Sequence, residues 1–348
     1  MNASTFDGDM ARAPVAAPHP THKLRLLLRR EFWEHKGGFF WAPIWAGGIS
    51  LVLYFMAILV GEVVARKAIA DGKIHGDNGF RINQLDIGML TKHMSAEDMR
   101  QAAQGIDLSL FLSGTWPFIV LGFVVFFYCL GALYDDRKDR SVLFWKSLPV
   151  SDRDTVLSKA ISATIVAPVI ATAVSLVTMF GFLMLVSAVV AIHGGNPFTL
   201  VWGLGSPLRI AAKLVATIPV YALWSLPTVG WLMLCSAWSR SKPFLWAVMI
   251  PIFAGIFVFW FDIMDLFNLD TAWFWQHIVL RALTSVFPGL WMSATSGIHV
   301  NGPEDFDRLL SLQQMYSVFA SPQIWIGAIA GIAMLFGAVR LRRWRDDN

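Results

Sequence analysis

Charged residues are scarce in this 348-residue sequence: Asp, Glu, Lys and Arg make up 15% of it, whereas hydrophobic residues make up 56%. A soluble domain of this size does not carry so much apolar surface. The two cysteines, Cys129 and Cys235, each lie inside an apolar run, which gives no support to a disulfide scaffold or a cysteine metal site. We therefore predict an all-α integral membrane protein.

Motifs for catalysis and cofactor binding are also lacking. The sequence contains no G-x-x-x-x-G-K-[ST] phosphate loop and no H-E-x-x-H zinc motif, and its eight histidines show no ligand spacing. No ionisable residue lies at mid-membrane in a predicted span, which argues against an ion-coupled carrier. We predict no enzyme activity, bound cofactor or metal for the chain alone. Basic residues beside the spans explain the net charge of +4 without a nucleic-acid partner.

Long apolar runs are what the sequence has in abundance. They predict six transmembrane helices, at about 39–65, 111–133, 160–192, 210–238, 244–261 and 323–339. The polar segments between them are assigned to the outside at 66–110, 193–209 and 262–322, and to the inside at 134–159. With the residues before the first span, the turn at 239–243 and the C-terminal residues also assigned to the inside, inner segments hold 18 of the 28 Lys and Arg residues and outer segments hold 9. This ratio predicts that both termini are cytoplasmic.

Two further segments complete the predicted architecture, in which 21–348 forms one domain after a disordered cytoplasmic tail at 1–20. Residues 21–36 combine leucines with arginines, as in an amphipathic helix lying in the membrane interface before the first span; a solvated connector is the alternative. Residues 271–298 are apolar, but a full crossing would bury Arg281 at mid-depth. We expect helices that dip into the outer leaflet before the sixth span.

The segment 134–159 differs from the other polar connections, because it mixes both signs of charge with an apolar stretch. Ser151 and Asp154 form an S-x-x-D pattern that predicts the start of a helix ahead of the third span. Residues 141–147 can form a short helix with an apolar face. We interpret the segment as a docking site for another protein; an interfacial loop that merely joins two spans is the alternative. The predicted contact residues are Asp135, Asp136, Arg137, Lys138, Arg140, Val142, Leu143, Phe144, Trp145, Lys146, Leu148 and Pro149.

The last span carries Gly327 and Gly331 in a G-x-x-x-G spacing. Small residues at this spacing let two membrane helices approach closely. The two glycines are therefore a candidate helix contact.

Residues 133–151 read LYDDRKDRSVLFWKSLPVS, and this string between the second and third spans resembles the coupling loop of type-2 ABC transporter permeases. The resemblance extends from residue 21 to the end of the chain. It implies a second permease copy or a homologous permease, and a separate cytoplasmic ABC ATPase that binds ATP and Mg²⁺. It further implies the bacterial inner membrane and export of a hydrophobic or amphipathic cargo, such as a lipid, peptide or drug-like molecule. The alternative is a non-transporting membrane anchor or signalling partner of such an ATPase.

Overall fold

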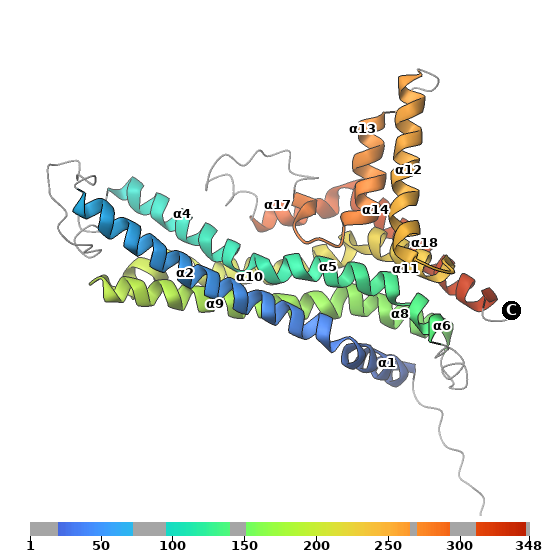
Figure 1. Cartoon of the computed structure of the whole chain (residues 1–348), viewed down its shortest axis with the longest axis horizontal. Helices are drawn as coiled ribbons and strands as arrows, with labels where there is room; N and C mark the ends of the chain where they lie inside the picture. The colour runs from blue at the N-terminus through green and yellow to red at the C-terminus, as the bar shows by residue number, and fades with distance from the viewer. Residues whose placement is uncertain (1–19, 72–94, 140–150, 265–269, 293–310, 346–348) are drawn as a thin grey trace, which may run out of the picture.

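The computed structural model describes residues 20–71, 95–139, 151–264, 270–292 and 311–345, and all regular structure in these ranges is helical. Most long helices run along one direction and form an elongated bundle (Figure 1). The predicted tail at 1–20 lies almost wholly outside the described residues. The described part contains five helices that are long and apolar enough to cross a membrane, or six if one bent pair counts as a span.

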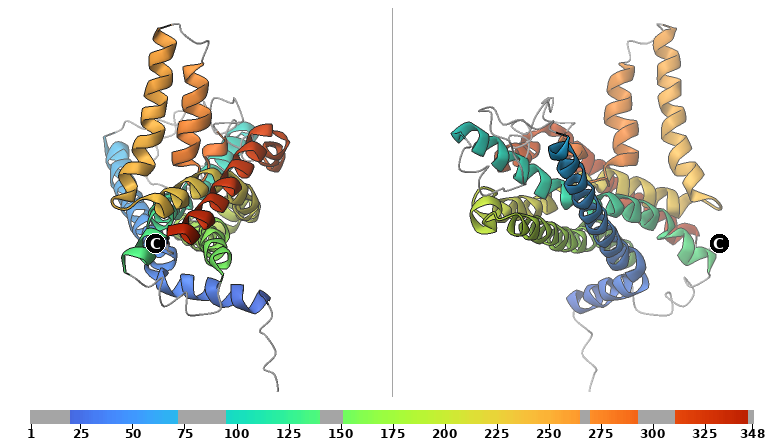
Figure 2. Two further views of the ribbon diagram at one scale, coloured as in Figure 1. Left: turned by 90° about the vertical axis from the view of Figure 1, so that its right-hand side faces the viewer. Right: turned by 60° about the vertical axis from the view of Figure 1, so that its left-hand side comes forward.

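The chain enters the bundle through α1 (Pro20–Glu34), which lies crosswise at one end, below α8 (Figures 1 and 2). Leu27 is buried on its inner face, whereas Arg25 and Arg29 are exposed, as the amphipathic pattern predicts. A π-helical turn, η1 (Gly37–Trp41), leads into α2 (Ala42–Ala70). The apolar side chains of α2 are mostly exposed, which suits a helix that faces lipid.

The second helical run begins ahead of the predicted span. That span, 111–133, corresponds to α5 (Thr115–Gly131) and the end of α4 (Ala96–Ser113), whereas the polar first turns of α4 lie in the predicted outer segment. A capping box explains the start: Ser95 Oγ accepts a hydrogen bond from Asp98 N, and the Asp98 carboxylate accepts one from Ser95 N.

The third predicted span belongs to a 41-residue rod made of α8 (Asp152–Ile161), the π-helical turn η2 (Ser162–Val166) and α9 (Ala167–Ile192). At 1.5 Å per residue the rod is about 60 Å long, twice the thickness of the hydrocarbon layer. The π turn ends at Val166, two residues before Pro168, and the helix continues through the proline. The rod is therefore longer than one crossing of the hydrocarbon layer requires.

The fourth predicted span, 210–238, is broken. It consists of α10 (Pro207–Trp224) and α11 (Leu226–Trp238), which meet at Ser225 with a bend of 48°. Pro227 accounts for the position of the break, because its ring excludes the hydrogen bond that would continue α10.

A helical hairpin stands out from the bundle, at a steep angle to the other long helices (Figures 1 and 2). Its first arm is α12 (Pro243–Ile263), and its second is the continuous run of α13 (Thr271–Phe274), η4 (Trp275–Val279) and α14 (Leu280–Thr284). The arms are close at Gly255, where an added Cβ would lie 2.7 Å from the Trp275 ring. Helices were expected in 271–298, and residues 293–298 lie outside the described part.

The chain ends with α17 (Leu312–Ser317), the 3₁₀ turn η5 (Val318–Ala320) and α18 (Pro322–Arg345), which packs along α11. A Cβ added at Gly331 would lie 2.4 Å from Leu226 O, and one at Gly327 would lie 3.0 Å from Pro227 Cγ. The close approach expected of Gly327 and Gly331 is therefore present, and the neighbouring helix belongs to the same chain.

Candidate functional site

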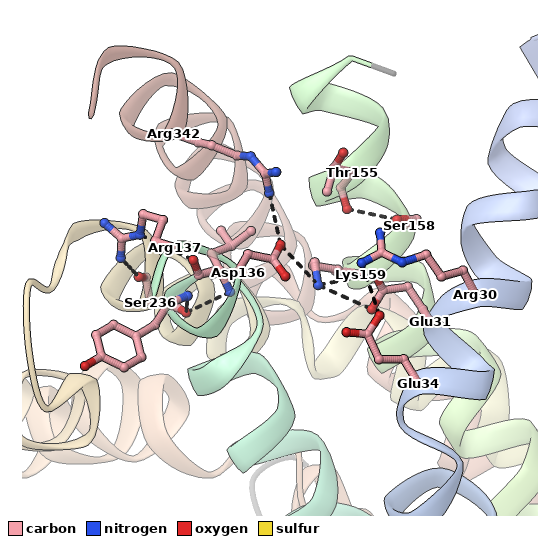
Figure 3. A network of polar contacts seen from close by, with 12 residues as sticks. Arg30, Glu31, Glu34, Asp136, Arg137, Thr155, Ser158, Lys159, Ser236 and Arg342 are labelled. Carbon is pink, nitrogen blue, oxygen red and sulfur yellow. Dashed lines mark hydrogen bonds and ion pairs between the residues drawn. The ribbon is translucent and has the colours of Figure 1, made fainter. Parts of the chain in front are cut away.

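Four charged residues from four helices meet at the end of the bundle where α1 lies (Figure 3). Glu31 comes from α1, Asp136 from α6 (Tyr134–Lys138), Lys159 from α8 and Arg342 from the end of α18. Asp136 and Lys159 lie on the two sides of residues 140–150, within the segment predicted to bind a partner. The ionic cluster, as we call these four residues, thus joins that segment to helices near both ends of the chain.

The lysine occupies the centre of the ionic cluster. Lys159 Nζ lies 3.2 Å from Glu31 Oε1 and 3.5 Å from Asp136 Oδ2, and Arg342 Nη1 lies 3.4 Å from the same Asp136 oxygen. The side chains of Glu31 and Lys159 are each 1% exposed, that of Arg342 is 5% and that of Asp136 is 9% exposed. Two carboxylates and two cations are therefore held together almost out of contact with solvent.

Neighbouring groups fix the orientation of Glu31 and Arg342, which lie at the two sides of the ionic cluster. Tyr128 OH donates a hydrogen bond of 2.9 Å to Glu31 Oε2, and the His35 ring meets the Tyr128 ring edge-on at 4.7 Å. At the opposite side, Arg342 Nε lies 3.2 Å from Asp152 Oδ1, in the first turn of α8. The ionic cluster thereby also reaches α5 and the start of the rod.

A second set of contacts ties α6 to α11. Ser236 Oγ accepts hydrogen bonds from the backbone N–H groups of Leu133 and Tyr134, at 3.0 and 2.9 Å. The guanidinium of Arg137 donates to Ser236 O (Figure 3). It also donates to Ser239 O, at 3.0 Å. The backbone and the arginine of the α6 region are thus both anchored to the C-terminal end of α11.

The arrangement of these charges suits a structural role. Its charges neutralise one another, and no group of three or more His, Cys, Asp or Glu side chains suited to a metal ion occurs among the described residues. A buried ion pair adds little net stability, but removing one partner is costly, so such pairs specify one arrangement of the elements that carry them. The site can hold α1, α6, α8 and α18 in a fixed relation.

The predicted contact residues fall into three groups. Asp136 and Arg137 are engaged inside the chain, whereas Asp135 and Lys138 are exposed at the end of α6. Ser151 is the N-cap of α8, and its Oγ accepts a hydrogen bond of 3.1 Å from Asp154 N. The remaining predicted residues lie outside the described part: Arg140, Val142, Leu143, Phe144, Trp145, Lys146, Leu148 and Pro149.

Sequence reasoning did not find Glu31, Lys159 and Arg342. One signal was available for Glu31, because it lies four residues after the buried Leu27 and hence on the inner face of α1. Lys159 and Arg342 stand in charged stretches beside apolar runs, where basic residues are expected for reasons of topology alone. Only the fold brings the three together.

No family model, curated protein or solved structure matches this chain. What the chain does therefore has to follow from its own residues and their geometry.

Proposed function

We propose that this chain is the membrane-spanning permease subunit of an ATP-driven exporter, with ATP and Mg²⁺ bound by a separate cytoplasmic ABC ATPase. A second permease copy or a homologous permease would complete the complex in a bacterial inner membrane. One observation carries the proposal: the segment 134–159 is anchored on both sides of residues 140–150 in a single buried ionic cluster. An isolated connecting loop has no need of such an anchor.

Force applied to this segment has a defined route. A push on α8 moves Lys159, which carries Glu31 of α1 with it and, through Asp136, Arg342 of α18. The same push moves the unbroken rod of α8, η2 and α9, whose far end contacts α2 where His193 Nε2 lies 3.6 Å from Glu62 Oε1. A displacement on the ATPase side can thereby reach the opposite end of the bundle.

The surface available to an ATPase begins at Asp135 and Lys138, which are exposed next to residues 140–150. Opposite charges three residues apart on a short helix suit an interface that selects its partner by charge complementarity. Asp136 is unsuitable for testing this docking surface, because its replacement would also break the ionic cluster.

The test combines co-purification with transport. The chain and the ATPase that co-purifies with it are placed in proteoliposomes, and ATP-dependent movement of a fluorescent amphipathic probe is recorded. Exchange of charges by Asp135→Lys with Lys138→Glu should reduce ATPase binding and probe movement. A matched control is Glu97→Lys with Arg100→Glu, an exposed acid–base pair of the same spacing on α4.

The outcomes separate the two candidate functions. ATP-driven movement that is lost in the Asp135/Lys138 variant and kept in the Glu97/Arg100 variant supports export. ATPase binding without probe movement supports the non-transporting anchor or signalling partner. Failure of any ABC ATPase to bind the chain would overturn the proposal.

A further inference from the structure

A cavity of about 370 Å³ lies away from the ionic cluster, between α11, α18 and the helical hairpin. Its volume is within the range of about 300–1,000 Å³ that is typical of ligand pockets. Its wall is largely apolar and includes Trp231, Ile250, Ala254, Trp273, Ile326 and Met334.

One charged side chain, Arg281 of α14, lines this cavity. Its Nη1 donates a hydrogen bond of 2.9 Å to Gln323 O, and its guanidinium stacks 3.9 Å from the centre of the Trp224 ring. Its Nε and Nη2 atoms are buried without a hydrogen-bond partner, and no carboxylate of the described residues lies within ion-pair distance. The guanidinium group of an arginine stays protonated in proteins at neutral pH.

The fold holds this arginine in place from several sides. The backbone carbonyl of Arg281 accepts hydrogen bonds from Thr228 Oγ1 at 2.7 Å and from Ser285 Oγ at 2.8 Å. On α18, Gly327 leaves the space that the guanidinium occupies, because an added Cβ would lie 2.6 Å from Nη2. A partly buried cation without a counter-charge is costly, and here it is built into the wall of a cavity.

The neighbouring polar side chains already satisfy one another. His277 Nδ1 donates to Trp273 O at 3.0 Å, which leaves Nε2 to accept a hydrogen bond from Gln323 Nε2 at 3.0 Å. Arg281 is therefore the charged side chain on this wall, and it has no counter-charge among the described residues. An anion in the cavity would supply the missing charge.

We propose that this cavity binds an anionic amphiphile, with its acyl chain against the apolar wall and its carboxylate or phosphate paired with Arg281. The N-terminus of α18, which begins at Pro322 beside this site, adds a partial positive charge that favours the same head group. The occupant can be a free fatty carboxylate or an anionic phospholipid of the bilayer, since both present the same chemistry. The inference does not rest on the proposed export function, because it concerns binding to the chain alone.

The test uses the full chain, purified without an ATPase in an uncharged detergent. Brominated acyl chains quench tryptophan on contact, and Trp231 and Trp273 line the cavity. The probes are dibromostearate, its uncharged methyl ester, and phosphatidylglycerol and phosphatidylcholine with one brominated chain. Each probe is titrated into the native chain, Arg281→Gln, Arg281→Lys and Ala254→Trp, the last of which adds a bulky ring to the α12 side of the cavity and keeps the arginine. Arg209→Gln, at an exposed arginine of α10, is the matched control.

We expect saturable quenching by at least one of the two anionic probes, and the probe that saturates at the lower concentration identifies the source of the ligand. Arg281→Gln should weaken this binding roughly tenfold or more, as loss of a charge-assisted contact does. Arg281→Lys and Arg209→Gln should keep it, and Ala254→Trp should abolish it. Equal affinity for the ester or for phosphatidylcholine, or unchanged binding in a folded Arg281→Gln or Ala254→Trp protein, would overturn the proposal.

Discussion

Replacement of Lys159 by methionine is the most informative perturbation of the ionic cluster. Methionine keeps the length and the apolar part of the side chain but removes the cation between Glu31 and Asp136. Asp136 retains Arg342 as a partner. Within the described part of the chain, Glu31 retains the hydroxyl of Tyr128 and the more distant ring of His35. The variant therefore isolates one carboxylate in a buried site.

The separations in the ionic cluster set the size of the effect. At 3.2 and 3.5 Å, and with an effective dielectric constant of about 20, each contact of Lys159 contributes roughly 5 kcal/mol of Coulomb attraction. Burial of the ammonium group offsets several kcal/mol of this gain. The expected net result is a fall of about 3–5 kcal/mol in the free energy of unfolding, as found when one partner of a buried ion pair is removed.

Reversible unfolding in mixed micelles, followed by circular dichroism, measures this change. Lys138→Met is the control, since Lys138 is exposed on α6 and its replacement should change stability by less than about 0.5 kcal/mol. The double variant Glu31→Gln with Lys159→Met removes both charges of one pair. It should be more stable than the sum of the single changes by about 0.5–3 kcal/mol.

Two results would refute this reasoning. One is a Lys159→Met protein as stable as the Lys138→Met control. The other is strict additivity of the Glu31 and Lys159 changes, which would mean that the two charges do not interact.

Further predictions concern helix contacts. Gly331→Ala should destabilise the packing of α18 on α11, because its Cβ would lie 2.4 Å from Leu226 O. Gly61→Ala on α2 is the control: its Cβ would meet nothing within 4 Å, so the change should be neutral or slightly stabilising. Thermal unfolding compares the stability of the two variants. Ser236→Ala should cost about 1–3 kcal/mol by leaving two backbone N–H groups of the α6 region without an acceptor, and equal stability to the native chain in the same unfolding assay would argue against that anchor.

Uninterrupted apolar runs were the part of the fold that the sequence pattern located best. The runs at 39–65, 244–261 and 323–339 correspond to α2, α12 and α18, with ends shifted by a few residues. Composition marks such helices because each must present apolar side chains along a length that matches a membrane. The steep angle of α12 to the bundle has no comparable sequence signal (Figure 1).

The ends and breaks of the other helices depend on contacts that composition does not record. Pro219 and Pro227 both occur in the fourth apolar run, yet α10 contains Pro219 without a break and the bend falls at Ser225. Local caps were more informative: the pattern of Ser151 and Asp154 predicted a helix start, and α8 begins at Asp152. Helix caps can be recognised in a sequence because both partners of the capping hydrogen bond lie within one turn of the chain.

The ionic cluster could not be predicted, because its members lie far apart in the sequence. Members that contact each other directly are separated by as many as 206 residues, as in the pair of Asp136 and Arg342, and no local rule pairs them. Arg281 is an intermediate case. Its charge within an apolar stretch led to the prediction of helices that dip into the outer leaflet, whereas the cavity that it lines is visible only in the fold.

The most direct test of the account is whether the helices joined by the ionic cluster move together when the partner ATPase binds ATP. Spin labels at the exposed Arg29 of α1, Arg153 of α8 and Arg343 of α18 report the distances within this group, and a label at Arg209 of α10 reports its distance to the other end of the bundle. The account predicts that ATP changes the distances to Arg209 and leaves the three distances within the group unchanged. Separation of α1 or α18 from α8 on ATP binding, with unchanged distances to Arg209, would contradict it.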